Sequence, residues 1–219
     1  MAEGLIARQI AVTGGAGFIG TALARRFAAN DVRVLDLGIH DQGPSSVEGV
    51  QTVIGDVRDH QAVASFVNEA DIVIHLASIA GVSSVVRNPT LTMETILLGA
   101  HNVLSSVAAG RRVQRVIIFS TSEVAGRFAY NVTEDATLTG ARTTEMRWTD
   151  AAAKLASEFQ AAAFYSEHRV PTTCLRPFNI YGPGQLGSGS PRIRVSSRSR
   201  RGPGDPWGWI AGPRLVLHR

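Results

Sequence analysis

Residues 9–20 read QIAVTGGAGFIG, an apolar run followed by a glycine-rich turn and by the start of a helical pattern that continues to residue 29. Glycine recurs at every third position of the turn, as Gly14, Gly17 and Gly20. In such a unit the first glycine permits the tight turn, the second lets the backbone approach a pyrophosphate, and the third lets the helix pack on the strand. The unpaired N–H groups at the helix start favour an anion. The segment therefore predicts a dinucleotide-binding turn.

An acidic residue follows the next apolar run. Residues 32–35, VRVL, predict a second strand, and Asp36 comes directly after it, sixteen positions beyond Gly20. An acid near this position accepts hydrogen bonds from both hydroxyls of a ribose and repels a 2′-phosphate. We therefore expect NAD, rather than NADP, as the cofactor.

Strand and helix patterns alternate along the rest of the chain. Strand patterns occupy residues 50–54, 71–76, 116–119 and 171–176, and helical patterns occupy residues 59–70, 90–109 and 148–168. The run at 71–76 is almost continuously apolar, as expected for a strand covered on both faces. The alternation predicts an α/β fold with a Rossmann-type, doubly wound parallel sheet.

The composition is that of an ordinary soluble protein, with 44% apolar and 18% charged residues in a chain of 219. No apolar run reaches the length of a membrane span and the N-terminus lacks a signal peptide, so we expect no membrane partner and a cytoplasmic location. Cys174 is the single cysteine, which excludes an internal disulfide. The histidines show no metal-ligand spacing, and we expect no metal.

Further motifs follow TGGAGFIG in order: GDVRD at 55–59, HLAS at 75–78, STSEV at 120–124 and LRPFNIYGPGQ at 175–185. With these motifs the sequence from residue 9 to 187 resembles the extended short-chain dehydrogenases/reductases, the group of nucleotide-sugar epimerases, dehydratases and decarboxylases. The resemblance implies NAD as cofactor, a nucleotide-diphosphate sugar as substrate and a 4-keto sugar intermediate. It also implies a homodimer formed through the helices expected at 90–109 and 148–168.

The resemblance also implies roles for individual residues. Thr121 would hydrogen-bond the reacting sugar hydroxyl, Asn179 would contact the diphosphate side of the substrate, and Glu123 stands where decarboxylases and dehydratases carry a working acid. The implied catalytic residues are Thr121, Glu123, Asp150 and Lys154. The implied cofactor-binding residues are Gly14, Gly17, Phe18, Ile19, Gly20, Asp36, Asp56, Val57, Leu76, Ala77, Lys154 and Phe178.

The sequence departs from the resemblance at the general base. Such enzymes carry a tyrosine four residues before the lysine, on the same helix face, and the positive charge lowers the pKa of the phenol. This chain keeps Lys154 but has Asp150 at the tyrosine position. A carboxylate beside Lys154 is expected to be ionised and a weak base, and losing a positioned acid–base group costs about 10²–10⁴-fold in rate. Ile96 and Ala125 replace a usual asparagine and tyrosine.

Three functions remain open at this point. A 4-epimerase acting on a nucleotide-diphosphate sugar is the broadest interpretation of the resemblance. The residues Thr121, Ser122 and Glu123, together with Arg147 and Trp148, also suit a nucleotide-sugar decarboxylase or dehydratase. A non-catalytic NAD-binding protein or a truncated remnant explains Asp150, Ile96 and the unusual C-terminal tail together.

The last part of the chain differs in composition from the rest. From residue 187 onward there are seven arginines, one acid and no regular period, which predicts an NAD-binding domain at 1–187 and a basic, disordered tail at 188–219. From Gly204 on, permitted codons read in a shifted frame can spell EIHGDGSQxRAWCYID, close to the GDGxQxRxxxYVDD segment of the family. We hypothesise that the tail is an out-of-frame translation of a missing substrate lobe. A nucleic-acid-binding arm is disfavoured, because repeated base-stacking aromatics are lacking.

Overall fold

The computed structural model describes residues 8–38, 47–126, 132–133 and 142–185, and every structural statement below concerns this part of the chain. These residues form a six-stranded sheet in the order β3-β2-β1-β4-β5-β6, and every pair of neighbouring strands is parallel. The strands are β1 (Gln9–Thr13), β2 (Asp31–Asp36), β3 (Val50–Ile54), β4 (Ile72–His75), β5 (Arg115–Phe119) and β6 (Thr172–Leu175). The predicted Rossmann-type sheet is confirmed.

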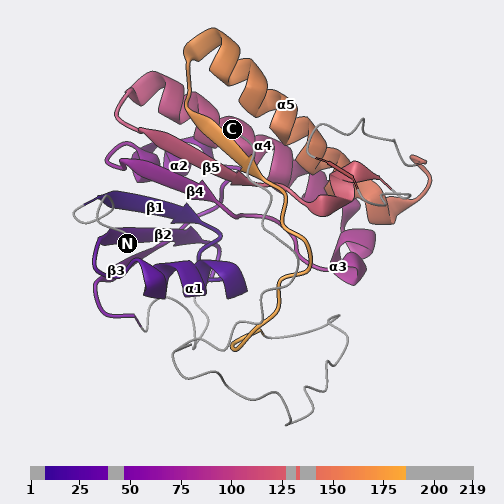
Figure 1. Ribbon diagram of the computed structural model, residues 1–219, viewed down its shortest axis with the longest axis horizontal. Helices are drawn as coiled ribbons and strands as arrows, with labels where there is room; N and C mark the ends of the chain where they lie inside the picture. The colour runs from indigo at the N-terminus through magenta and orange to yellow at the C-terminus, as the bar shows by residue number, and fades with distance from the viewer. Residues whose placement is uncertain (1–7, 39–46, 127–131, 134–141, 186–219) are drawn as a thin grey trace.

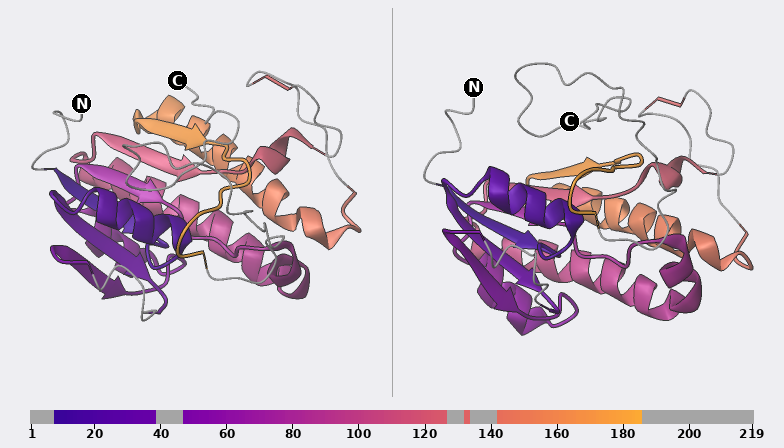
Figure 2. Two further views of the ribbon diagram at one scale, coloured as in Figure 1. Left: turned by 60° about the horizontal axis from the view of Figure 1, so that its bottom comes forward. Right: turned by 90° about the horizontal axis from the view of Figure 1, so that it is seen from below.

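Helices cover both faces of the sheet. They are α1 (Phe18–Arg26), α2 (His60–Val67), α3 (Val82–Arg87), α4 (Pro89–Gly110) and α5 (Thr149–His168), with the short 3₁₀ helices η2 (Ser122–Ala125) and η3 (Met146–Trp148). Helix α1 lies on one face, and α2, α4 and α5 lie on the other (Figures 1 and 2). The short helix α3 was missed by the sequence analysis, because six residues that run almost directly into α4 show no period of their own.

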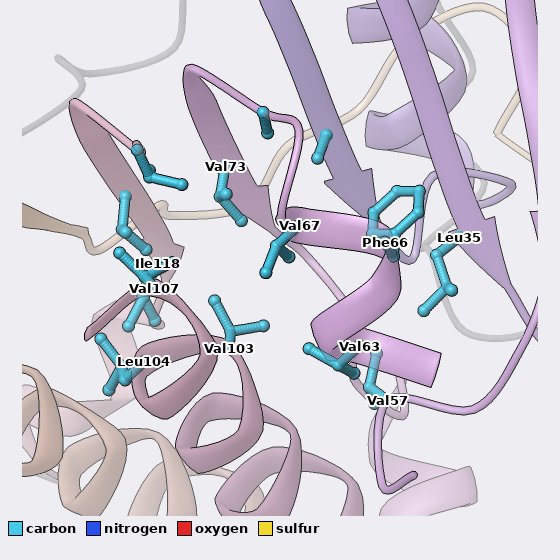
Figure 3. Packing of buried hydrophobic residues seen from close by; sticks show 14 of the residues in the cluster. Leu35, Val57, Val63, Phe66, Val67, Val73, Val103, Leu104, Val107 and Ile118 are labelled. Atoms are coloured by element: carbon cyan, nitrogen blue, oxygen red, sulfur yellow. The ribbon is translucent and has the colours of Figure 1, made fainter. Parts of the chain in front are cut away.

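Alternating residues of the strands contribute side chains to two hydrophobic cores, one on each face of the sheet. On β1, Ala11 faces the core shared with α2 and α4, whereas Ile10 and Val12 face the core shared with α1. Figure 3 shows the first of these cores, in which α2 and α4 interdigitate over the sheet. Its labelled members are Leu35, Val57, Val63, Phe66, Val67, Val73, Val103, Leu104, Val107 and Ile118. Burial on both faces explains why the strands read as continuous apolar runs.

The strand order reverses between β1 and β4. The chain proceeds outward from β1 to β3, crosses back to β4 and then proceeds to β6 in the other direction. Parallel strands place all their carboxyl ends at one edge of the sheet, and the two diverging connections leave a crevice outside that edge at the reversal point. The loops after β1 and β4 therefore bound the crevice. The hypotheses about the tail, and the domain boundary at residue 187, concern residues outside the described part of the chain.

The packing of α1 on the glycine turn gives a first testable prediction. A Cβ atom on Gly20 would lie 2.4 Å from the Cα atom of Gly15, so an alanine requires the backbone to move. We expect Gly20→Ala to lower the free energy of unfolding by about 1–3 kcal/mol, as overpacked cores do. Gly38→Ala is the matched control, since no atom lies within 4 Å of the added Cβ. Urea unfolding measures both, and equal midpoints for the two variants contradict the tight contact.

Candidate functional site

The glycine turn after β1 packs closely against the segment that follows β4. Gly14 has a φ angle of 68°, which favours glycine, and its amide donates to the carbonyl of Leu35 at 2.8 Å. A Cβ atom on Gly14 would lie 2.6 Å from the backbone nitrogen of Ala77. The amide of Leu76 also donates to the carbonyl of Thr13 at 3.0 Å. Gly14, Leu76 and Ala77 thus form one continuous wall of the crevice.

Helix α1 begins at this wall with an N-terminus that suits an anion. Gly17 is its N-cap residue, without a side chain to cap the first N–H groups, and the first turn contains no acidic residue. The nearest atom to a Cβ atom on Gly17 would be the carbonyl oxygen of Gly14, at 3.4 Å, so this side of the turn is open. Phe18, Ile19 and Gly20 form the first turn of the helix. An open backbone and a helix dipole are what a pyrophosphate requires.

Asp36 stands at the end of β2 beside the same turn. Its Oδ2 atom accepts a hydrogen bond of 2.9 Å from the amide of Ala16, within the glycine motif. This bond holds the carboxylate at the edge of the sheet, next to the start of α1. The position matches the one expected for an acid that accepts hydrogen bonds from a ribose.

The segment after β3 is held by residues whose positioning roles were not foreseen from sequence. Arg58 donates to both carboxylate oxygens of Asp56, at 2.6 to 3.1 Å, and to Glu94 on α4 at 3.2 Å. The hydrogen bond from Arg58 holds the pKa of Asp56 below its usual range. The buried Asn102 donates to the carbonyl of Val57 at 2.9 Å. Asp56 is therefore ionised and fixed at the crevice edge.

A buried polar layer lies beneath the wall. The Nζ atom of Lys154, whose residue is 6% exposed, donates to the carbonyl of Phe119 at 2.6 Å. His75 is 2% exposed, and its Nδ1 atom lies 2.7 Å from the hydroxyl of Thr13. Burial, and then the charge of Lys154, lower the pKa of His75 to about 3, so this imidazole is neutral. Burial also lowers the pKa of Lys154, against the opposing charge of Asp150.

Asp150 lies in the first turn of α5, facing the end of β4. The hydroxyl of Ser78 donates to its Oδ1 atom at 3.3 Å. Burial raises the pKa of Asp150, and the charge of Glu123 adds to this, while Lys154 and the Ser78 hydrogen bond lower it. The sequence-based expectation of an ionised, weak base took account only of the charge of Lys154, and burial shifts the pKa of Asp150 the other way. Loss of solvent outweighs the neighbouring positive charge.

The remaining predicted residues follow β5 and β6 at the same edge. The hydroxyl oxygen of Thr121 accepts the amide of Glu123 at 3.3 Å and so begins η2. The Glu123 carboxylate pairs with Arg147 at 3.3 Å, on the same side as Asp150. Phe178 is 51% exposed, and Asn179 beside it is also exposed. The glycine turn and the residues of α5 are far apart in the sequence. The segment after β4 contacts both, through Ala77 and Ser78.

A model of the NAD dependent epimerase/dehydratase family matches residues 10–201. The chain belongs to this family. The UDP-N-acetyl-alpha-D-glucosaminuronate decarboxylase of Bacillus cytotoxicus is 31% identical over 181 residues, which are 80% of this chain and 56% of that protein. The dTDP-glucose 4,6-dehydratase of Mycobacterium tuberculosis is 29% identical over 185 residues, which are 81% and 55% of the two chains.

Solved structures agree with this assignment. The dTDP-glucose 4,6-dehydratase of Streptomyces venezuelae, solved with NAD bound, has a TM-score of 0.72 and 28% identity, and the match covers 81% of this chain and 57% of that one. The UDP-glucose 4-epimerase of Thermus thermophilus, in complex with NAD, has a TM-score of 0.70 and 29% identity, and the match covers 83% of this chain and 58% of that one. The expected family resemblance is confirmed. The chain spans about half the length of these relatives.

This member of the epimerase/dehydratase family also has an ion pair that binds α5 to the ends of two strands. Arg176, just beyond β6, donates to both oxygens of Glu158 at 2.6 to 3.2 Å. Glu158 also accepts a hydrogen bond from the hydroxyl of Ser120, after β5, at 2.5 Å. Both charged side chains are mostly buried. This pair was not predicted, although Glu158 lies one turn after Lys154 on the same helix.

The described residues contain no group of three or more His, Cys, Asp or Glu side chains arranged to hold a metal. None of the helices in the described ranges is long and apolar enough to cross a membrane.

The buried His75 makes the stability of the fold dependent on pH. Between pH 6.5 and about 3 the unfolded chain binds a proton that the folded chain excludes, because the pKa of His75 is lowered only in the fold. Its contribution to the free energy of unfolding is therefore complete above pH 6.5 and falls on acidification by at most about 1.4 kcal/mol per pH unit. We expect His75→Asn to flatten this dependence in urea unfolding measured across the range.

The exposed His60 supplies the control for this measurement. His60→Asn should keep the pH dependence of the unsubstituted chain. An equally steep fall in the His75→Asn variant would show that other groups cause the loss of stability.

Proposed function

We propose that this chain binds NAD across the carboxyl edge of the sheet and that its site oxidises a hydroxyl of a nucleotide-diphosphate sugar to a ketone. The observation that supports this most strongly is the arrangement at the strand reversal. There the uncapped N-terminus of α1 at Gly17, the carboxylate of Asp36 and the backbone of Ala77 all border the glycine turn. The Asp36 carboxylate favours NAD over NADP, because it repels a 2′-phosphate.

The remaining cofactor contacts follow from the placement of the edge residues. The pyrophosphate would lie over Gly14, Gly17 and the first turn of α1, and the adenine would lie at Asp56 and Val57. Phe178, half exposed in the segment after β6, would flank the nicotinamide. Lys154 would hold the adjoining ribose. When bound, NAD supplies the acceptor for a hydride from the sugar carbon.

The sugar would lie against η2 and the segment after β6. Thr121 has a hydroxyl proton to donate toward a sugar hydroxyl, and Asn179 is exposed at the same edge. Oxidation at C4 to a 4-keto sugar is the step that a 4-epimerase, a dehydratase and a decarboxylase share. We take 4-epimerisation as the primary reaction.

A decarboxylase or dehydratase is the second candidate, and the pair formed by Glu123 and Arg147 favours it. The guanidinium of Arg147 lies 3.3 Å from Glu123 and 4.5 Å from the ring of Trp148, at the edge of the site. A fixed arginine of this kind suits the carboxylate of a uronate sugar. Glu123 is placed to move a proton after the ketone has formed.

A third candidate is an NAD-binding protein without turnover, which Asp150 favours. A carboxylate is shorter than a phenol and reaches less far into the crevice. This candidate shares the cofactor site with the first two. Cofactor binding and turnover must therefore be measured separately.

The glycine turn provides the test of cofactor binding. In Gly17→Ala the added methyl group has room in the folded chain, with its nearest contact at 3.4 Å, but projects where a pyrophosphate must approach. We expect this variant to unfold at the same urea concentration as the unsubstituted chain and to lose at least about tenfold in NAD affinity by calorimetry. Gly38→Ala should change neither quantity. Unchanged NAD affinity in Gly17→Ala contradicts the proposed site.

We also propose a homodimer formed through α4 and α5. Leu98 on α4 is 47% exposed and Phe159 on α5 is 68% exposed, although these two helices pack against each other over much of their length. A second copy would bury both side chains in a four-helix contact. We expect light scattering to give twice the chain mass, and Phe159→Asp to give the monomer mass without loss of helix content. A monomer at all concentrations for the unsubstituted chain contradicts this assembly.

A further inference from the structure

Ser78 and Asp150 meet at the crevice although they are 72 residues apart in the sequence. Ser78 closes the HLAS motif after β4, on the wall that the glycine turn contacts. Asp150 lies in the first turn of α5. The hydroxyl of Ser78 donates to the Oδ1 atom of Asp150, so its proton already points at the carboxylate.

Ser78 adds a hydroxyl next to the short side chain of Asp150. A carboxylate ends most of an aromatic ring short of a phenol oxygen at the same position. The Ser78 oxygen lies 3.3 Å from Oδ1 of the carboxylate, across one hydrogen bond, and so supplies a second oxygen next to the short side chain. A hydroxyl that donates its proton still has two lone pairs with which it accepts one. Ser78 can therefore accept a proton from a sugar hydroxyl while passing its own to Asp150.

The charges around the pair adjust Asp150 for this role. Lys154 lies one turn further along α5, with its Nζ atom on the carbonyl of Phe119, and Glu123 faces the site from η2. His75, from β4, is neutral. Burial of Asp150 raises its pKa, and Glu123 raises it further. A carboxylate that binds its proton more tightly than usual is a better general base near neutral pH.

We propose that Ser78 and Asp150 form a proton relay that performs the acid–base step of the site in place of a single phenol. The relay rests on the proposed function. The O–H bond of the sugar hydroxyl breaks and its proton forms a new O–H bond on Ser78, while the original Ser78 proton moves to Oδ1 of Asp150. Ser78 ends neutral, Asp150 ends as the neutral acid, and the hydride from the same sugar carbon leaves to the nicotinamide of NAD. The reverse transfers return the proton when the ketone is reduced.

Single-turnover formation of reduced nicotinamide tests the relay. The chain is mixed with NAD and with UDP-glucose, UDP-glucuronate or dTDP-glucose, and the absorbance of reduced nicotinamide is followed. We expect Ser78→Ala and Asp150→Asn each to slow its formation by about 10²–10⁴-fold, and the double variant to be no slower than either single one. Ser78→Thr, which keeps the hydroxyl, should stay within about tenfold of the unsubstituted chain.

The pH profile separates a relay from a merely structural contact. The rate should rise with pH as Asp150 loses its proton, and Asp150→Asn should remove this rise. In Ser78→Ala the rise of the residual rate should be shifted to higher pH. The hydrogen bond from Ser78 lowers the pKa of Asp150, so its loss leaves that pKa higher. Carboxyl-carbon NMR of Asp150 should show the same upward shift without any substrate present.

The outcomes distinguish the relay from the cofactor site. NAD affinity, measured by calorimetry for every variant, should remain that of the unsubstituted chain. Failure of the unsubstituted chain to bind NAD overturns the proposed function, and the relay with it. If NAD binds but no reduced nicotinamide forms with any of the sugars, the relay is overturned and the cofactor site stands. An unchanged rate in Ser78→Ala likewise overturns the relay alone.

Discussion

The close backbone contact between the glycine turn and the end of β4 is the constraint on which the rest of the site depends. A Cβ atom at Gly14 would lie 2.6 Å from the nitrogen of Ala77, so the absence of a side chain lets the two segments meet. They belong to the two halves of the sheet, whose strands proceed in opposite directions from β1 and β4. Their contact closes one wall of the crevice and places Asp36 and Ser78 on a common edge.

Behind this wall, buried polar groups set the protonation of the site. Lys154 is held by the carbonyl of Phe119, and His75 is paired with Thr13 and kept neutral. In a region that excludes water, charges interact strongly and an unpaired polar group is costly. Asp150 at the border of this region therefore has a proton affinity that differs from that of a surface aspartate.

The elements that the sequence predicted well are those with a local physical signal. The strand at 50–54 was predicted at its observed bounds, and the helical pattern at 59–70 contains α2, which Asp59 caps by accepting hydrogen bonds from the amides of Gln61 and Ala62. The short helix α3 has no such signal, and the pair of Glu158 and Arg176 joins positions that no local pattern connects. Only the packing of α5 on the sheet brings Glu158 and Arg176 together.

The sequence by itself determined the fold class and the type of cofactor, because apolar periodicity, glycine spacing and an acid after the second strand act over a few neighbouring residues. The family followed from the resemblance of its ordered motifs, which are also local. Only the tertiary structure decided the direction of the pKa shift of Asp150 and its hydrogen-bond partner. In the sequence its nearest charge is Lys154, which predicts an ordinary ionised carboxylate. In the fold Asp150 is buried and meets the hydroxyl of Ser78. A pKa depends on solvent exclusion and on groups that are distant in sequence, and only packing brings these together.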